Sequence, residues 1–161
     1  MGIFGGLYYW FPKFSGRMFS EKLGKVQFFL LFIGQNITFF PMHFVGMDGM
    51  PRRIYTYSGE MGWTALNALE TSGSILVVIS VLLFLHNIVK SWRSGEEAPG
   101  DPWDARTLEW SISSPPPEYN FEIIPEVHTV DEWWAQKRGL LGEQSPSVGA
   151  NEKGEIHLPQ P

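Results

Sequence analysis

The stretch VQFFLLFIGQNITFFPMHFVG, residues 26–46, decides the fold of this chain. It contains no charged side chain and is rich in phenylalanine, leucine and isoleucine. As a helix with a rise of about 1.5 Å per residue, it reaches about 30 Å, the thickness of the hydrocarbon core of a bilayer. A second apolar run occupies residues 61–90. Two such runs in tandem favour transmembrane helices over the buried core helix of a soluble protein.

The charged residues that flank the two runs predict their orientation. Residues 13–25, which we expect to form a loop, hold four basic residues and one acidic residue, whereas residues 47–60 are balanced. The positive-inside rule therefore places residues 13–25 and the chain after residue 90 in the cytoplasm, and the loop 47–60 on the outer side.

An arginine pair lies in the outer loop. Arg52 and Arg53 occupy the side that is usually poor in positive charge, and the nearby acids are Asp48 and Glu60. Because arginine stays charged and prefers planar, bidentate acceptors such as carboxylates, the pair either lies in water or binds acidic groups of a partner subunit, a lipid or a cofactor.

The two ends of the chain differ from the spans. Residues 1–12 are apolar and aromatic but too short to cross a bilayer, so we expect the end of a transmembrane helix whose first half is missing, or else an interfacial or re-entrant helix. Residues 91–138 combine a polyproline stretch with many aromatic side chains, which predicts an extended segment laid along another protein surface. Residues 139–161 are polar, and we expect disorder there.

Charge and composition exclude several classes of function. Residues 1–93 carry a net charge of +4 and residues 94–161 a net charge of −9, and no basic stripe for nucleic acid is present. The chain has no cysteine, which rules out disulfides and Cys-rich metal sites. We find no catalytic triad, metal-binding motif or phosphate loop, so no catalytic residue and no metal ligand is assigned.

Polar groups inside the spans need partners because bare polar groups in hydrocarbon are costly. His43 has no second ligand at a matching spacing, which favours a structural, hydrogen-bonded histidine. Pro41 cannot donate a backbone hydrogen bond and frees the carbonyl of Ile37. Glu70, the one acid within a span, is either a proton relay or ion site, or a protonated or hydrogen-bonded group near a wet cavity. Small residues at 65, 68 and 72 share one face and predict close helix packing.

Four stretches together carry a family resemblance. They are residues 5–12 (GGLYYWFP), 36–46 (NITFFPMHFVG), 49–53 (GMPRR) and 107–117 (TLEWSISSPPP), the last followed by Asn120-Phe121. In this order they closely resemble subunit I of the haem–copper oxidases, specifically the bacterial aa3-type cytochrome c oxidase branch. The resemblance covers about residues 1–134.

The resemblance implies an all-α membrane fold, the last part of a twelve-helix bundle. The chain would supply the end of one helix (residues 1–12), a cytoplasmic loop (13–25), one transmembrane helix (26–46), an outer loop (47–60), a second transmembrane helix (61–90) and an extended C-terminal tail that packs on the complex (91–138). It would be a C-terminal fragment located in the inner membrane with a cytoplasmic tail.

The resemblance also implies cofactors and partners. In the family the arginine pair contacts the propionates of two haem A groups, so Arg52 and Arg53 carry over as propionate contacts, and Phe39 and Met42 match positions beside the low-spin haem. The haem and copper ligands lie on earlier helices that this chain does not contain, so the fragment alone would be inactive. Its partners would be the rest of subunit I, subunits II and III, cytochrome c through the complex, and the lipid bilayer.

The function implied is that of the parent enzyme, which reduces oxygen to water with electrons from cytochrome c and pumps protons. The first alternative is a two-span scaffold or assembly protein without a redox cofactor. The second is a relative that oxidises quinol, because a partner subunit, and not this chain, determines which electron donor is used.

Overall fold

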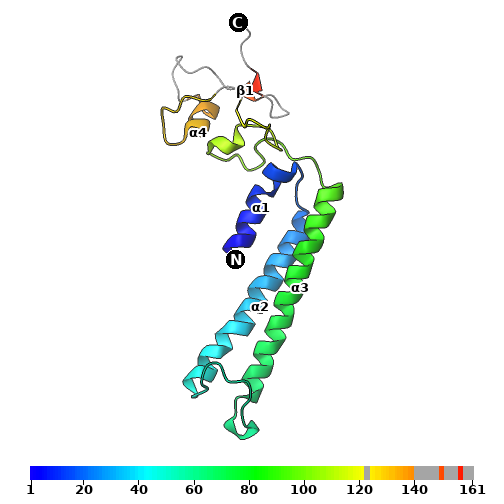
Figure 1. Cartoon of the computed structure of the whole chain (residues 1–161), viewed down its shortest axis with the longest axis vertical. Helices are drawn as coiled ribbons and strands as arrows, with labels where there is room; N and C mark the ends of the chain where they lie inside the picture. The colour runs from blue at the N-terminus through cyan, green and yellow to red at the C-terminus, as the bar shows by residue number, and fades with distance from the viewer. Residues whose placement is uncertain (122–123, 140–148, 151–155, 158–161) are drawn as a thin grey trace. The chain divides into compact units, whose positions relative to one another are not determined.

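The computed structural model describes residues 1–121, 124–139, 149–150 and 156–157. Figure 1 shows a helical chain whose elements are α1 (Gly2–Ser15), α2 (Glu21–Met47), the 3-10 turn η1 (Gly59–Met61), α3 (Thr64–Ser94), the 3-10 turn η2 (Leu108–Trp110), α4 (Glu132–Lys137) and two short strands, β1 (Gly149–Ala150) and β2 (Ile156–His157). The strands pair antiparallel, with Gly149 opposite His157. The chain divides into two compact units, Ser20–Lys90 and the combination of Met1–Phe19 with Ser91–Pro161.

The unit Ser20–Lys90 is an antiparallel pair of long helices, which run side by side in Figure 1. Both helices are long and apolar enough to cross a membrane. The buried positions recur at steps of three and four residues, so each helix presents one stripe to its neighbour. On α2 the stripe consists of Gln27, Leu31, Gly34, Thr38, Pro41 and Val45. On α3 it includes Glu70, Gly73, Ser80, Phe84 and Asn87.

Two glycines bring these helices into close contact. A carbon atom added at Gly73 would lie 2.6 Å from the backbone nitrogen of Thr38, and one added at Gly34 would lie 3.0 Å from the backbone nitrogen of Val77. Nearer the other end of the pair, Gln27 donates through Nε2 to the Ser80 hydroxyl at 3.0 Å, and that hydroxyl donates to the Gln27 carbonyl at 3.0 Å. The pair therefore combines backbone approach with buried hydrogen bonds, as helix pairs in lipid do.

The small residues that were predicted to allow close helix packing do not face α2. Ala65, Ala68 and Ser72 are exposed on α3, so their packing against another helix stays a prediction, and Gly73 makes the close contact with α2. The helix ends also differ from the predicted spans. α2 begins five residues before residue 26, and its polar first turn carries an exposed ion pair from Lys25 to Glu21 at 2.9 Å. Apolar runs mark the membrane-embedded part of a helix and not its polar ends.

The other unit packs the segment after α3 against α1. Phe11 is buried and stacks on Phe19 with ring centroids 3.9 Å apart. Trp110 is 1% exposed and meets Tyr9 edge to face at 5.1 Å, and the indole of Trp103 donates to the Tyr9 carbonyl at 2.9 Å. The sequence indicated another protein's surface for these tryptophans. In the structure their partner is α1 of the same chain.

Backbone pairing and a second helix complete this unit. The amide of Met18 donates to the Glu96 carbonyl, and the amide of Ala98 donates to the Gly16 carbonyl, both at 2.9 Å. Residues 91–138 are also less extended than expected, because α4 forms within them and buries Trp133. The disorder expected for residues 139–161 lies outside the described residues, apart from Gly139 and the two strands.

Candidate cofactor-contact site

The arginine pair lies in a loop that is built by the end of α2. The amides of Asp48, Gly49 and Met50 donate to carbonyls of the last helical turn at 2.9, 3.2 and 3.1 Å. Gly49 has φ +92°, a conformation that L side chains rarely adopt, which explains a glycine before the arginines. The side-chain amide of Asn67 on α3 lies 3.6 Å from the Met50 sulfur, so the loop is also tied to the start of the next helix.

Both arginines are exposed and available to a ligand. Within the described part of the chain, neither guanidinium has a hydrogen bond or an ion pair, so Asp48 and Glu60 do not serve as partners. Arg53 has φ 67°, which is uncommon for a residue with a side chain. A strained, charged residue without a local partner is typical of a binding loop.

The predicted haem-neighbouring residues lie on α2 before this loop. Phe39 is 52% exposed and Met42 is 44% exposed, and they alternate with Thr38 and Pro41, which face α3. The two side chains therefore belong to the open side of α2. They form an apolar surface that leads toward the arginine loop and has no cover within the pair of helices.

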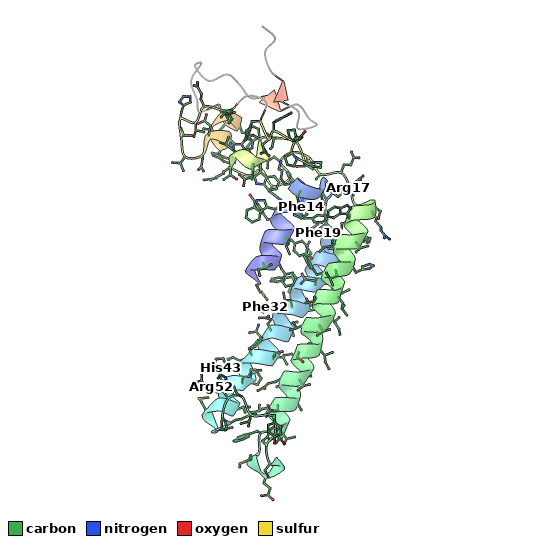
Figure 2. All side chains as sticks on the ribbon, in the orientation of Figure 1. Phe14, Arg17, Phe19, Phe32, His43 and Arg52 are labelled. Carbon is green, nitrogen blue, oxygen red and sulfur yellow. The ribbon has the colours of Figure 1, made fainter. Side chains whose placement is uncertain are left out.

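Polar side chains near the same end of α2 bond to their own helix. His43 Nδ1 lies 3.0 Å from the Phe39 carbonyl oxygen, and the tautomer with its proton on Nδ1 donates to that oxygen. Figure 2 shows His43 and Arg52 at the loop end of the pair of helices. Asn36 donates through Nδ2 to the Phe32 carbonyl at 2.7 Å. Among the described residues, no three His, Asp or Glu side chains come together in a way that could hold a metal ion.

One buried cation is not evident from the sequence. Lys13 was counted as a loop charge, but it lies in the last turn of α1 and is 8% exposed. Its ammonium donates to the carbonyls of Gly100, Ile112 and Ser113 at 3.0, 2.7 and 3.3 Å and lies 5.1 Å from the centre of the Trp110 ring. Burial lowers the pKa of Lys13 to about 8, against the opposing charges of two acids. Nothing in the sequence marks these distant carbonyl partners.

A second missed cluster holds α4 in place. Asp101 accepts from Lys137 Nζ at 2.7 Å, from the Trp133 indole at 3.2 Å and from the Ala105 amide at 2.8 Å. Burial opposes ionisation of Asp101, but the hydrogen bonds from these three donors hold the pKa of the carboxyl below its ordinary value. Asp104 also accepts from Lys137 at 2.7 Å. This cluster is structural and lies in the unit that contains α1.

Comparison with known proteins decides the family. Residues 1–79 match the family described as cytochrome c and quinol oxidase polypeptide I. The chain is 45% identical over 158 residues to cytochrome c oxidase subunit 1 of Bacillus sp. (strain PS3), an alignment that covers 98% of this chain and 25% of that protein. The chain belongs to the oxidase subunit I family. It spans about a quarter of the length of the curated relatives that it matches.

Other members of the subunit I family give the same range of similarity. The chain is 47% identical over 128 residues to the putative cytochrome c oxidase subunit 1-beta of Streptomyces avermitilis, covering 78% of this chain and 23% of that protein. It is 41% identical over 159 residues to quinol oxidase subunit 1 of Bacillus subtilis, covering 97% and 24%. Its two long apolar helices correspond to the last part of the subunit I membrane bundle.

Proposed function

We propose that this chain is part of the subunit I of a proton-pumping terminal oxidase, which reduces oxygen to water with electrons from cytochrome c. The cytochrome c oxidase subunit 1 relatives, at 45% and 47% identity, support this proposal. The chain's own part is to hold haem A by its acidic edge and to complete the helix bundle. By itself it would be inactive, because in the family the iron and copper ligands lie in another part of the subunit.

The observation that carries the proposal is the arginine pair. Arg52 and Arg53 are exposed, lie at the end of a transmembrane-type helix and have no acidic partner within the described residues. Haem propionates are carboxylates at the edge of a flat apolar ring, and arginine binds carboxylates in a bidentate manner. The exposed apolar face that carries Phe39 and Met42 supports a contact with the ring, and the arginines support contacts with its acids.

The charge of the arginines would tune the cofactor that they hold. Haem, when bound, supplies an iron that accepts and passes on one electron. The two guanidinium groups would donate hydrogen bonds to the propionates, offset their negative charge and fix the haem edge. Because reduction adds negative charge to the haem, nearby cations favour the reduced form and raise its potential.

The proposal is tested by redox titration of the haems in the assembled oxidase that contains this chain. For a guanidinium about 10 Å from the iron in a medium of effective dielectric constant about 20, the Coulomb energy is about 1.7 kcal/mol, which is about 70 mV for one electron. Arg52→Gln and Arg53→Gln should each lower a haem midpoint potential by roughly this amount. Arg52→Lys keeps the charge and should have a smaller effect.

Arg93→Gln is the matched control, because Arg93 is exposed in the last turn of α3, at the opposite end of that helix. It should leave the potentials unchanged. Equal potentials in the wild type and in both arginine-pair variants would contradict the propionate contacts. A purified complex without any haem would instead favour a two-span scaffold or assembly protein.

A quinol-oxidising enzyme is a second candidate, because the chain is 41% identical to a quinol oxidase subunit 1. The donor separates the two. Oxygen consumption by the purified complex with reduced cytochrome c as donor would support the first candidate, and consumption with a reduced quinol alone would support the second. In either case we propose an inner-membrane location, with residues 13–25 and the tail on the cytoplasmic side. The neighbours of the chain would be the rest of subunit I, subunits II and III, and lipid.

A further inference from the structure

Glu70 is a buried carboxyl that the proposed haem contacts do not use. It lies in the second turn of α3, and the residue is 8% exposed. Its Oε1 atom is fully buried and has no hydrogen-bond partner within the described residues, nor does the carboxyl form an ion pair there. Glu70 is therefore buried within this chain itself.

The register of the two helices identifies what faces Glu70. Gln27 meets Ser80, and Gly34 and Thr38 meet Gly73. Because the helices are antiparallel, one further turn places Pro41 of α2 beside Glu70 of α3. Both residues belong to the buried stripes of their helices.

Neither stripe offers a cation to a charged Glu70. The α2 stripe is made of Gln27, Leu31, Gly34, Thr38, Pro41 and Val45. On α3 the other buried positions are Gly73, Ser80, Phe84, Asn87 and Ser91, and Trp63 is buried just before the helix. None of these side chains is ionisable in the relevant range. A carboxylate taken out of water without a partner costs so much free energy that the group instead binds a proton.

A protonated carboxyl carries a hydroxyl that needs a hydrogen-bond acceptor, and Pro41 leaves one backbone carbonyl free to accept. Because Pro41 lacks an N–H, the carbonyl of Ile37 loses its usual partner one turn along α2. That carbonyl lies at the contact of the two helices, since a carbon added at Gly73 would sit 2.9 Å from the Ile37 carbonyl carbon. Gly73 is one turn from Glu70 on the same stripe.

We propose that Glu70 is a proton-binding site within the membrane-spanning pair, a neutral carboxylic acid whose hydroxyl donates to the Ile37 carbonyl that Pro41 leaves free. As a neutral acid in apolar surroundings, it is also a modification site for hydrophobic carbodiimides. The acid proton moves to a carbodiimide nitrogen, and the carboxylate oxygen bonds to the central carbon. The acyl group then shifts from oxygen to nitrogen, giving an N-acylurea that retains every atom of both reactants.

The test is labelling of the full chain in its assembled complex in native membranes with dicyclohexylcarbodiimide at pH 7, followed by peptide mass mapping. A glutamate in water, with a pKa of about 4.3, is protonated in about one molecule in 500 at this pH. Glu60 in the exposed turn η1 is the matched control on the same chain. Glu70 should be labelled about 100-fold faster than Glu60, and the site should not be labelled in Glu70→Gln.

An infrared measurement tests the acceptor separately. The infrared difference spectrum of the wild-type complex minus the Glu70→Gln complex should show the C=O stretch of a protonated carboxylic acid. This band should shift in D2O. Pro41→Ala restores the amide that occupies the Ile37 carbonyl, so it should shift this band. Labelling of Glu70 no faster than that of Glu60, together with no acid band, would overturn the proton-binding site and indicate a carboxylate paired with another part of the complex. A band that Pro41→Ala leaves unmoved would overturn Ile37 as the acceptor.

Discussion

Replacing Lys13 with methionine should release the segment after α3 from α1. Methionine keeps most of the aliphatic stem but removes the ammonium that bonds to three carbonyls. The two shorter bonds, to Ile112 at 2.7 Å and Gly100 at 3.0 Å, are buried. In the variant both carbonyls lose their donor in a place that water reaches poorly, and the contact of the ammonium with the Trp110 ring is lost as well.

The magnitude follows from the number and burial of these bonds. A hydrogen bond to a charged group contributes about 1.5–3 kcal/mol. Burial of the ammonium costs part of this gain, as the lowered pKa of Lys13, about 8, indicates. We therefore expect Lys13→Met to weaken docking by about 2–4 kcal/mol, which increases the population of the undocked segment by about 30- to 700-fold.

Amide hydrogen exchange in the full chain within its complex measures this opening. The amides of Ala98 and Ser111, which bond to the carbonyls of Gly16 and Leu108, report on the segment. They should exchange about 100-fold faster in Lys13→Met. Lys22→Met removes an exposed lysine near the start of α2 and should change nothing. Unchanged exchange at both amides in Lys13→Met would refute the idea that Lys13 holds the segment in place.

Two further predictions concern the close helix contact and the α4 cluster. Gly73→Ala places a carbon 2.6 Å from Thr38 and should lower the free energy of unfolding of the complex by about 1–3 kcal/mol in denaturant titrations. Gly46→Ala is the control, because a carbon added there would meet nothing within 4 Å. Equal losses of stability in the two variants would contradict the close contact. Burial acts to raise the pKa of Asp101, but the three hydrogen bonds to its carboxyl outweigh burial and hold the pKa below the ordinary 3.8. The folded form therefore binds fewer protons than the unfolded form. Docking of α4 should therefore be complete above about pH 4 and weaken as the pH falls further, seen as faster pepsin cleavage within α4, and Asp101→Asn should lose this pH dependence.

The two long helices could be predicted because a long, charge-free apolar run has few alternatives in a membrane. Their ends could not, since the turn that contains Glu21 and Lys25 is helical but polar. The contact with α2 was not predicted: the spacing of alanine and serine predicts close packing on another face of α3, which stays a prediction, whereas Gly73 makes the close contact with α2. One glycine within a span gives no periodic signal.

The candidate site shows the same division. Arg52 and Arg53 are exposed, and within the described residues the salt bridges include neither of them. Their role as propionate contacts stays a prediction. The burial of Lys13 could not be predicted, because its partners are backbone carbonyls 87 to 100 residues away and carry no side-chain signature. The tryptophans of the tail were recognised as packing residues, but only the structure identifies α1 as their partner.

The most direct test of the propionate contacts is a cryo-electron microscopy map of the assembled oxidase that contains this chain. We predict that guanidinium nitrogens of Arg52 and Arg53 lie about 3 Å from haem propionate oxygens. A map that places both guanidinium groups in water, or against acidic side chains far from any haem, would contradict the account.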